Sequence, residues 1–509
     1  MKRTKIILID YQNGLFTNHY NVDDNQFVLP IGLQYLIAYL KKMEVEFEGE
    51  IIKSFIDFNG DEELMAYILK EKPDILGFRA MSLDQEGLLI TSQNIKDTYK
   101  KTYPDDKLIM ALGGPIANDD PNTMFETGIY DYVTIGEGEN TFYEIVKAFQ
   151  EDRIIKEKEI KGIVYGKNNF EVAQIKNLDD LPLPDYASFD FDKYDGKMNY
   201  GYNRRKQGVI LTSRGCPYRC VYCHNIFGKS ARLRSPEDIF SEMKVLYDDH
   251  GIKDIFFVDD IFNVDYQRAI DVFDLVIASD MDVNLYFPNG IRGDTIDKHY
   301  IDKMVAAGTI FVTFAVETAS MRLQKKIKKY LNVKKIKENI DYACSQNVMV
   351  NAFFLFGLPT ETQEEALLTL EFAEECDQLN FLYIFFSRYY PGTAMADIAM
   401  SEGFTREMIN NSINNLYHEV EKYETPTLPN KFIRYLKDYF VYRIIFNPKR
   451  IDSMLEMQSK FFTEEEIIGA INSLYKLNIT KLDEFRAYAT DMQKSSFVKN
   501  IKTKIEWSA

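Results

Sequence analysis

Short apolar runs alternate with longer stretches of helical periodicity over the first 150 residues. Apolar runs bounded by polar residues are typical of buried strands, whereas apolar residues three and four positions apart are typical of helices. Their alternation predicts βαβ units, and therefore a doubly wound parallel sheet with helices on both faces. The expected strands are Lys5–Ile9, Glu50–Ile56, Ile75–Phe78, Leu108–Leu112 and Tyr132–Ile135, and the expected helices are Ile31–Lys41, Asp61–Glu71, Gln85–Lys101 and Thr141–Phe149.

The same rhythm returns between residues 205 and 398. Six successive strand–helix repeats predict a partial (β/α)6 barrel of the TIM type, in which chemistry is expected at the carboxyl ends of the strands. The expected strands are Gly208–Thr212, Asp254–Val258, Asn284–Phe287, Phe311–Ala315, Met349–Phe356 and Phe381–Phe386.

The patterns divide the chain into four segments: a doubly wound domain over 1–150, a linker with a small hairpin over 151–204, the barrel over 205–398, and a helical region over 399–509. In the helical region we expect helices over Arg406–Lys422 and Asn430–Ile445. The second carries an aromatic stripe that fits either a core or the wall of a pocket: Phe432, Tyr435, Leu436, Tyr439, Phe440 and Tyr442.

Composition narrows the choice of partners. The formal charge of −17 argues against a nonspecific nucleic-acid or anionic-membrane surface. No apolar run approaches the roughly 20 residues needed to span a bilayer. The apolar run Ile6–Ile9 stops at Asp10, which is too short for a signal peptide. We therefore expect a cytoplasmic protein that binds neither nucleic acid nor membrane.

Three cysteines follow the first barrel strand with the spacing C-x3-C-x2-C: Cys216, Cys220 and Cys223. Cysteine thiolates are the usual ligands of iron–sulfur clusters. Three thiolates on a [4Fe–4S] cluster leave one iron without a protein ligand, and an open coordination site favours catalysis over a purely structural role. A short loop that leaves a strand can carry this arrangement.

Two other interpretations of these cysteines remain open. A structural zinc site needs four ligands, and His224 is the nearest candidate for the fourth. A disulfide is disfavoured because the chain has only 5 Cys and no secretory signal. Cys344 and Cys376 fall in helical patterns and are interpreted as buried core thiols.

Polar or glycine residues follow each later barrel strand, at the edge where the chemistry is expected. They are Asp259 and Asp260, Arg292 in the turn Asn289–Asp294, Glu317, Gly357, and the segment Ser387–Thr393. In the first domain, the corresponding strand ends carry Asp10, Gly113, Gly114, Gly136, Glu137 and Gly138. Glycines allow close backbone approach to a ligand, but turns after strands are often glycine-rich without one.

The cysteine spacing resembles the cluster motif of the radical S-adenosylmethionine (SAM) superfamily. This resemblance implies that the open iron chelates the amino and carboxylate groups of SAM. It implies that Asp259 or Asp260 holds the amino group, that Arg292 meets the carboxylate, and that Glu317 binds the ribose hydroxyls. The backbone at Gly357 and at Tyr222 would contact the adenine.

The first domain resembles the cobalamin-binding domain that precedes the barrel in many radical SAM enzymes. The resemblance rests on Leu29–Leu36, Gly113-Gly114-Pro115 and Ile135–Glu139, and it implies that these glycine-rich turns accept the nucleotide tail of cobalamin. The signature D-x-H-x-x-G is absent after Asp10, and the nearest histidine is His19. The resemblance therefore implies a cobalt without a histidine ligand.

Together these features predict an enzyme that cleaves SAM to a 5′-deoxyadenosyl radical and performs cobalamin-dependent methyl transfer to an unactivated carbon or phosphorus. The substrate would be a metabolite or peptide, and an external flavodoxin- or ferredoxin-type protein would supply single electrons. Two alternatives stay open. One is a radical rearrangement, dehydration or cyclisation without methyl transfer, and the other is a non-catalytic iron–sulfur redox or sensor protein.

Overall fold

The computed structural model describes residues 3–12, 29–194, 205–223, 226–390, 393–414, 420–495 and 498. The backbone divides into two compact units. The N-terminal unit comprises Met1–Tyr200 with Ile226–Gly228 and Arg232–Arg234, and the C-terminal unit comprises the remaining residues. Within the described ranges, no helix is both long and apolar enough to cross a membrane.

The N-terminal unit is built on a five-stranded parallel sheet with the order β2-β1-β3-β4-β5. This order confirms the doubly wound prediction, and it places the switch in winding direction between β1 and β3. The strands are β1 (Thr4–Tyr11), β2 (Phe47–Lys53), β3 (Ile75–Ala80), β4 (Ile109–Gly113) and β5 (Tyr132–Val133). The helices are α1 (Ile31–Lys42), α2 (Ser54–Asp57), α3 (Asp61–Glu71), α4 (Gln85–Thr102), α5 (Pro115–Asp119), α6 (Pro121–Glu126) and α7 (Gly138–Gln150).

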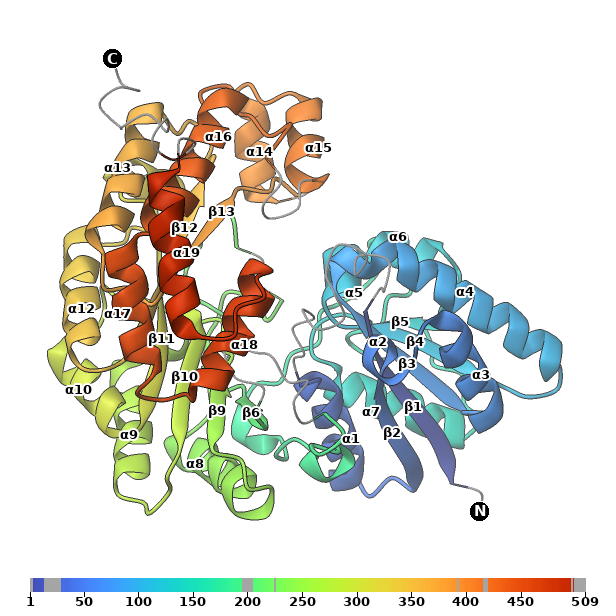
Figure 1. Cartoon of the computed structure of the whole chain (residues 1–509). Helices are drawn as coiled ribbons and strands as arrows, with labels where there is room; N and C mark the ends of the chain where they lie inside the picture. Colours follow the sequence, from blue (N-terminus) through green and yellow to red (C-terminus); the bar gives the residue numbers. More distant parts are fainter. Residues whose placement is uncertain are drawn as a thin grey trace. The chain divides into compact units, whose positions relative to one another are not determined.

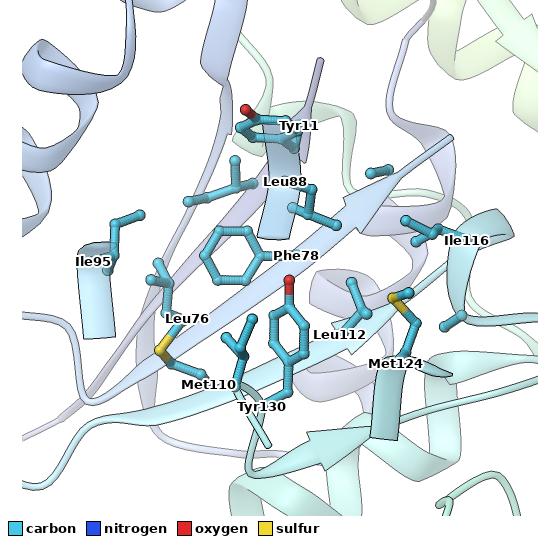
Figure 2. Packing of buried hydrophobic residues seen from close by; sticks show 14 of the residues in the cluster. Tyr11, Leu76, Phe78, Leu88, Ile95, Met110, Leu112, Ile116, Met124 and Tyr130 are labelled. Atoms are coloured by element: carbon cyan, nitrogen blue, oxygen red, sulfur yellow. The ribbon is translucent and has the colours of Figure 1, made fainter. Parts of the chain in front are cut away.

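Alternate residues of β1 serve two separate hydrophobic cores, one on each face of the sheet. Ile7 and Ile9 belong to a core that includes residues of α3 and α4, and Figure 2 shows part of it around Phe78 and Leu88. Ile6 and Leu8 belong to a second core with residues of α1 and α7. A central parallel strand is covered on both faces, which explains why its sequence is continuously apolar.

The predicted strand Glu50–Ile56 is three residues too long at its carboxyl end. β2 stops at Lys53, and the chain turns directly into the short helix α2. The carboxylate of Asp57 accepts a hydrogen bond of 2.8 Å from the backbone N–H of Lys53. This local bond stabilises the first backbone turn against continued extension.

Residues after α7 extend the β5 edge. Thr134 forms an isolated bridge with Ile163, and Gly136 forms one with Ala173. A third bridge, Gly166 with Asn169, lies where the hairpin was predicted. The division of the chain into four segments stays a prediction.

The C-terminal unit contains a six-stranded parallel sheet with the order β13-β12-β11-β10-β9-β6. Figure 1 shows helices α9, α10, α12 and α13 lying along one side of these strands, which confirms the partial barrel. The strands are β6 (Gln207–Ile210), β9 (Asp254–Phe257), β10 (Asn284–Ile291), β11 (Thr309–Glu317), β12 (Met349–Phe356) and β13 (Phe381–Phe386). The helices are α8 (Pro236–Lys244), α9 (Tyr266–Ile277), α10 (Lys298–Ala306), α11 (Met321–Lys326), α12 (Val333–Ser345) and α13 (Gln363–Glu375).

The chain after the barrel is helical, as expected. Its helices are α14 (Ala394–Ser401), α15 (Arg406–Asn414), α16 (Asn430–Tyr439), α17 (Pro448–Gln458), α18 (Glu464–Tyr475) and α19 (Leu482–Lys494). The predicted helix Arg406–Lys422 is too long, because residues 420–422 are not helical. Phe432, Leu436 and Phe440 of the aromatic stripe are fully buried, which favours its interpretation as core.

These C-terminal helices hold both edges of the barrel sheet at its amino end. Gln458 donates a hydrogen bond of 3.1 Å to Asn380, directly before β13. Arg205, just before β6, forms an ion pair with Glu466 of α18 at 2.6 Å. The open side of the partial barrel is thus braced away from the carboxyl edge, where the candidate site lies.

Candidate active site

The cysteine loop begins just after β6, at the carboxyl edge of the barrel sheet. Gly215 has a φ of +90°, which permits a sharp turn directly before Cys216. The loop is anchored at its far end, where the backbone N–H of Val221 donates a 3.0 Å hydrogen bond to the carbonyl of Ile327. Cys216 and Cys220 are half-buried, and Cys223 is exposed.

The thiols of Cys216 and Cys223 are influenced by their neighbours in the loop. Although Cys223 as a whole residue is exposed, loss of hydration around its sulfur raises the pKa of the thiol to about 11; Lys229 opposes this rise, and Asp260 and the other two thiols add to it. Burial also raises the pKa of Cys216. A bound metal cluster supplies the positive charge that stabilises thiolates in such a setting.

The loop supplies the type of ligand that a cluster with several irons requires. Among the described residues, no three Cys, His, Asp or Glu side chains converge on a position for a single ion. In a [4Fe–4S] cluster each thiolate binds a different iron, so such convergence is not required. The three residues that would hold the cluster are therefore Cys216, Cys220 and Cys223.

The two adjacent aspartates after β9 have different surroundings. Asp259 is buried, and its Oδ1 accepts hydrogen bonds from Thr212 Oγ1 at 2.8 Å and Ser213 Oγ at 2.5 Å. Its Oδ2 has no partner. Asp260 is exposed and influences the cysteine thiols. Of the two candidates for the SAM amino group, Asp260 is the one that faces the cluster loop.

Glu317 ends β11 in a strained conformation and joins the cluster loop to the strand. Its φ is +66°, which is unfavourable for a residue with a Cβ. Its Oε1 accepts hydrogen bonds from Tyr222 Oη at 3.1 Å and from Lys329 Nζ at 2.9 Å. Both donors bind the same carboxylate oxygen, so the side chain of the predicted ribose ligand is fixed in place.

Arg292 follows β10, with its guanidinium already held by neighbours. The group lies 4.3 Å from the ring centre of Tyr218, in the cysteine loop, and forms an ion pair with Asp294 at 3.0 Å. It also donates to the carbonyl of Tyr330 at 3.3 Å. These contacts place a fixed cation beside the loop, and its predicted contact with the SAM carboxylate stays a prediction.

Gly357 is required by the protein's own packing. Its φ is +77°, and an added Cβ would overlap the hydroxyl of Tyr423. Its N–H donates to Glu361 Oε2 at 2.6 Å, and its carbonyl accepts from Tyr389 Oη. These contacts fix the backbone of the segment that we expect to contact the adenine.

The carboxyl edge of the N-terminal sheet carries a buried group of charges. Asp10, on β1, forms ion pairs with Lys53 and, at 2.6 Å, with Arg79. Burial alone would raise the pKa of Asp10, but these two cations hold it below its ordinary value. Both carboxylate oxygens of Asp10 thus take part in internal ion pairs. Asp10 is only 1% exposed, which does not support its predicted contact with cobalamin.

Three of the four predicted glycines at this edge are explained by local packing. A Cβ at Gly113 would lie 2.8 Å from Thr134 Oγ1, and one at Gly114 would lie 2.7 Å from Arg79 Cγ. A Cβ at Gly136 would overlap the carbonyl oxygen of Ala173. Gly138 differs, because its nearest neighbour is the tip of Leu36 at 3.2 Å.

Glu137 lies between the last two of these glycines and is buried. It forms an ion pair with Arg232, within the N-terminal unit. It also lines a cavity of about 750 Å³ between α1, α7 and residues 159–181. Its predicted contact with cobalamin stays a prediction.

Sequence reasoning missed Lys329 and Lys229, which contact or influence the site. Lys329 lies in a run of lysines that is indistinguishable from a solvated helix end, and only the fold brings it to Glu317. Cys344 and Cys376 are buried, as expected for core thiols. His19, His224, the turn residues Asn13-Gly14 and the pair Pro391-Gly392 lie outside the described residues.

Comparison with known proteins agrees with this geometry. Residues 210–373 match the radical SAM superfamily, and residues 23–146 match the B12 binding domain. An uncharacterized methyltransferase of Pyrococcus horikoshii is 30% identical over 390 residues, which cover 74% of this chain and 80% of the relative. Cytidylyl-2-hydroxyethylphosphonate methyltransferase of Streptomyces wedmorensis is 25% identical over 428 residues, which cover 73% of this chain and 77% of the relative.

A solved structure shares the fold. The radical SAM methyltransferase TsrM from Kitasatospora setae, with cobalamin and a [4Fe–4S] cluster bound, has a TM-score of 0.64 at 15% identity, covering 97% of this chain and 100% of that chain.

A partial barrel that carries three spaced cysteines at the end of its first strand defines a radical SAM protein. The chain belongs to the radical SAM superfamily, among the members that carry a B12-binding domain ahead of the barrel. It is an enzyme, and its cofactors are a [4Fe–4S] cluster, SAM and cobalamin.

Proposed function

We propose that this enzyme is a cobalamin-dependent methyltransferase that acts on a small molecule. The observation that carries the proposal is the cysteine loop tied directly to Glu317 through Tyr222, at the carboxyl edge of a barrel that follows a B12-binding domain. The names of the relatives support transfer of a methyl group. When bound, the reduced cluster supplies the electron that cleaves SAM, and cobalamin serves as the methyl carrier.

The residues of the chain would bind and orient SAM. The carboxylate of Glu317 accepts hydrogen bonds from the ribose hydroxyls, and its hydrogen bonds with Lys329 and Tyr222 keep it oriented. Asp260 receives the amino group, and Arg292 attracts the carboxylate. The backbone at Gly357, fixed by Glu361 and Tyr389, contacts the adenine.

The structure of TsrM with tryptophan bound supports a small-molecule substrate. The formal charge of −17 argues against nucleic acid. A one-electron donor of the flavodoxin or ferredoxin type would reduce the cluster from outside. Free thiols and such donors are characteristic of the reducing cytoplasm, where we place the enzyme.

Product analysis with methyl-deuterated SAM tests the proposal. The anaerobic enzyme, loaded with cobalamin and given a strong reductant, should release 5′-deoxyadenosine and S-adenosylhomocysteine. Without cobalamin, only 5′-deoxyadenosine should form. In the opposite outcome, the fully loaded enzyme consumes a substrate mixture and releases 5′-deoxyadenosine without S-adenosylhomocysteine. That result would contradict methyl transfer and favour a radical rearrangement, dehydration or cyclisation.

A further inference from the structure

Strand alternation sorts the aromatic residues of β12 and β13 onto two faces of the barrel sheet. Phe354 points to the outer, helix-covered face, where its ring lies 6.2 Å from Phe372 and 6.0 Å from Phe440, centre to centre. Its neighbour Phe353 points to the inner face. Phe354 is fully buried, whereas Phe353 remains partly exposed.

Three partly exposed rings cluster on this inner face. Tyr383 is the register partner of Phe353, and Phe385 lies two residues further along β13. The ring centre of Phe353 is 5.5 Å from that of Tyr383 and 5.6 Å from that of Phe385, both edge-to-face. We call Phe353, Tyr383 and Phe385 the aromatic wall. Exposed rings at such a position supply flat apolar contact area for a ligand.

The residues beside the aromatic wall are small. Ala315 is the register partner of Phe353 on β11. An added Cβ at Gly290, on β10, would lie 3.4 Å from Ala315 Cβ and 3.7 Å from Phe353 Cε2. Neither residue sends a bulky side chain toward Phe353.

Polar atoms without hydrogen-bond partners lie on the same face, two residues closer to the amino ends of β11 and β12. Thr313 and Asn351 are register partners, exposed by 1% and 0%. Thr313 Oγ1 and Asn351 Nδ2 have no hydrogen-bond partner. Asn351 Oδ1 accepts from Phe381 N at 3.0 Å, which fixes the amide so that its Nδ2 cannot turn to that partner. Buried donors without partners are costly, and a ligand acceptor would relieve that cost.

Below this level the inner face is filled by the protein itself. The rings of Phe256 and Tyr286 stack at 4.1 Å, and Phe311 lies 6.0 Å from Tyr286. Tyr286 donates to Asp254 at 2.6 Å. Among the described residues, these rings close the inner face toward its amino end. Toward the carboxyl edge, Glu317 stands two residues beyond Ala315 on β11, or about 7 Å along the strand.

We infer that the aromatic wall, together with Thr313 and Asn351, binds a flat aromatic or heteroaromatic group of the substrate that carries a hydrogen-bond acceptor on its edge. The rings contact the faces and edges of this group, and Asn351 Nδ2 donates to its acceptor. This inference rests on the proposed function, for which it names the substrate class. It places the substrate ring directly beneath the residues that hold SAM.

Equilibrium dialysis of two flat probes against the anaerobic, cluster-loaded full chain tests the inference. Quinoline has one acceptor nitrogen, and naphthalene has the same shape without it. Phe353→Leu and Tyr383→Leu should each weaken the binding of both probes by about five- to tenfold, the value of one aromatic contact. Phe354→Leu is the matched control, because it removes the same ring from the outer face and should leave probe binding unchanged.

The hydrogen bond from Asn351 to the acceptor of the ligand is tested separately. Asn351→Leu should weaken quinoline by about tenfold and leave naphthalene unchanged, since one hydrogen bond is lost. If that variant loses its iron or fails to fold, Thr313→Val removes the other polar atom at the same level and should give a smaller loss of the same kind. Equal losses for both probes would contradict the acceptor and leave a purely apolar site.

The inference is overturned if quinoline does not bind the folded wild type, or if Phe353→Leu and Phe354→Leu behave alike. Dialysis requires no turnover, so its outcome is independent of methyl transfer. If the probes bind as expected but the turnover assay yields no S-adenosylhomocysteine, only the proposed function is contradicted. If methyl transfer occurs but substitutions in the aromatic wall do not change probe binding, only this inference is contradicted.

Discussion

The carboxyl edges of the two parallel sheets differ in the groups that they present. At the barrel edge, side chains from several strands meet around the cysteine loop, and Glu317 is tied to Tyr222 and Lys329. At the N-terminal edge, the charges of Asp10, Lys53 and Arg79 satisfy one another, and glycines replace side chains. The first edge presents chemical groups, and the second presents backbone. A cofactor bound by backbone leaves a weak signature in a sequence, whereas one bound by thiolates leaves a strong one.

The largest expected effect concerns the cluster. The triple variant Cys216→Ala, Cys220→Ala, Cys223→Ala should lose nearly all of the roughly four irons per chain, because no other cysteines have ligand spacing. Iron and sulfide analysis after anaerobic purification measures this. Cys344→Ala and Cys376→Ala serve as controls and should keep the iron; retention of iron in the triple variant would place the ligands elsewhere.

The next effect concerns the buried charges of the N-terminal edge. Asp10→Asn removes the negative charge that is paired with the buried Lys53 ammonium and should destabilise this unit by about 3–5 kcal/mol. Urea unfolding followed by circular dichroism measures the change. The double variant Asp10→Asn, Lys53→Met should recover most of the loss, and an equally unstable double variant would show that Asp10 acts through other contacts.

Glycine substitutions separate packing from cofactor binding at the same edge. Gly136→Ala should destabilise the fold by about 1–3 kcal/mol, because its Cβ would overlap the backbone of Ala173. Gly138→Ala should leave the unfolding free energy within about 0.5 kcal/mol, since it begins α7 and only the tip of Leu36 is near. A titration with hydroxocobalamin then decides whether Gly138 contacts the cofactor: weaker binding by this stable variant is expected, and unchanged binding would remove Gly138 from the site.

Much of the fold could be predicted from the sequence, because buried parallel strands are continuously apolar. β12 and β13 have the predicted bounds, β1 is one residue longer at its start and two longer at its end, and β3 is two residues longer at its end. Errors arose where short-range bonds override the pattern, as at Asp57 and Lys53. The cysteines of the site could be predicted from spacing alone. Lys329 and the ion pairs of Asp10 could not, because only the tertiary fold brings these charges together.

A smaller effect sharpens the role assigned to Glu317. Glu317→Gln keeps the size of the side chain but removes its charge, and it should weaken SAM binding by about 1–3 kcal/mol, which corresponds to roughly 5- to 150-fold. Titration of SAM against the electron paramagnetic resonance signal of the reduced cluster measures this affinity. The iron content should stay unchanged, and wild-type affinity would contradict the ribose contact.

A further expected effect is a pH dependence of stability at Glu361, which accepts a hydrogen bond from the N–H of Gly357. Burial raises the pKa of Glu361 from its ordinary value of 4.5 to about 8, so the folded state binds the proton more tightly than the unfolded chain. The stability contributed by this proton is complete below pH 4.5 and is lost as the pH rises through 8, by at most about 1.4 kcal/mol per pH unit. Urea unfolding at pH 6 and pH 9 should show a smaller difference for Glu361→Gln than for wild type. The exposed control Glu371→Gln should behave as wild type, and an unaltered pH difference in Glu361→Gln would assign the dependence to another group.

The contrast between a side-chain site and a backbone site is tested most directly by electron paramagnetic resonance of the anaerobic protein loaded with cobalamin and partly reduced. We predict a [4Fe–4S] signal that changes when SAM is added, together with a Co(II) signal that lacks nitrogen superhyperfine splitting. A cluster signal insensitive to SAM, or a Co(II) signal split by an axial histidine nitrogen, would contradict this account.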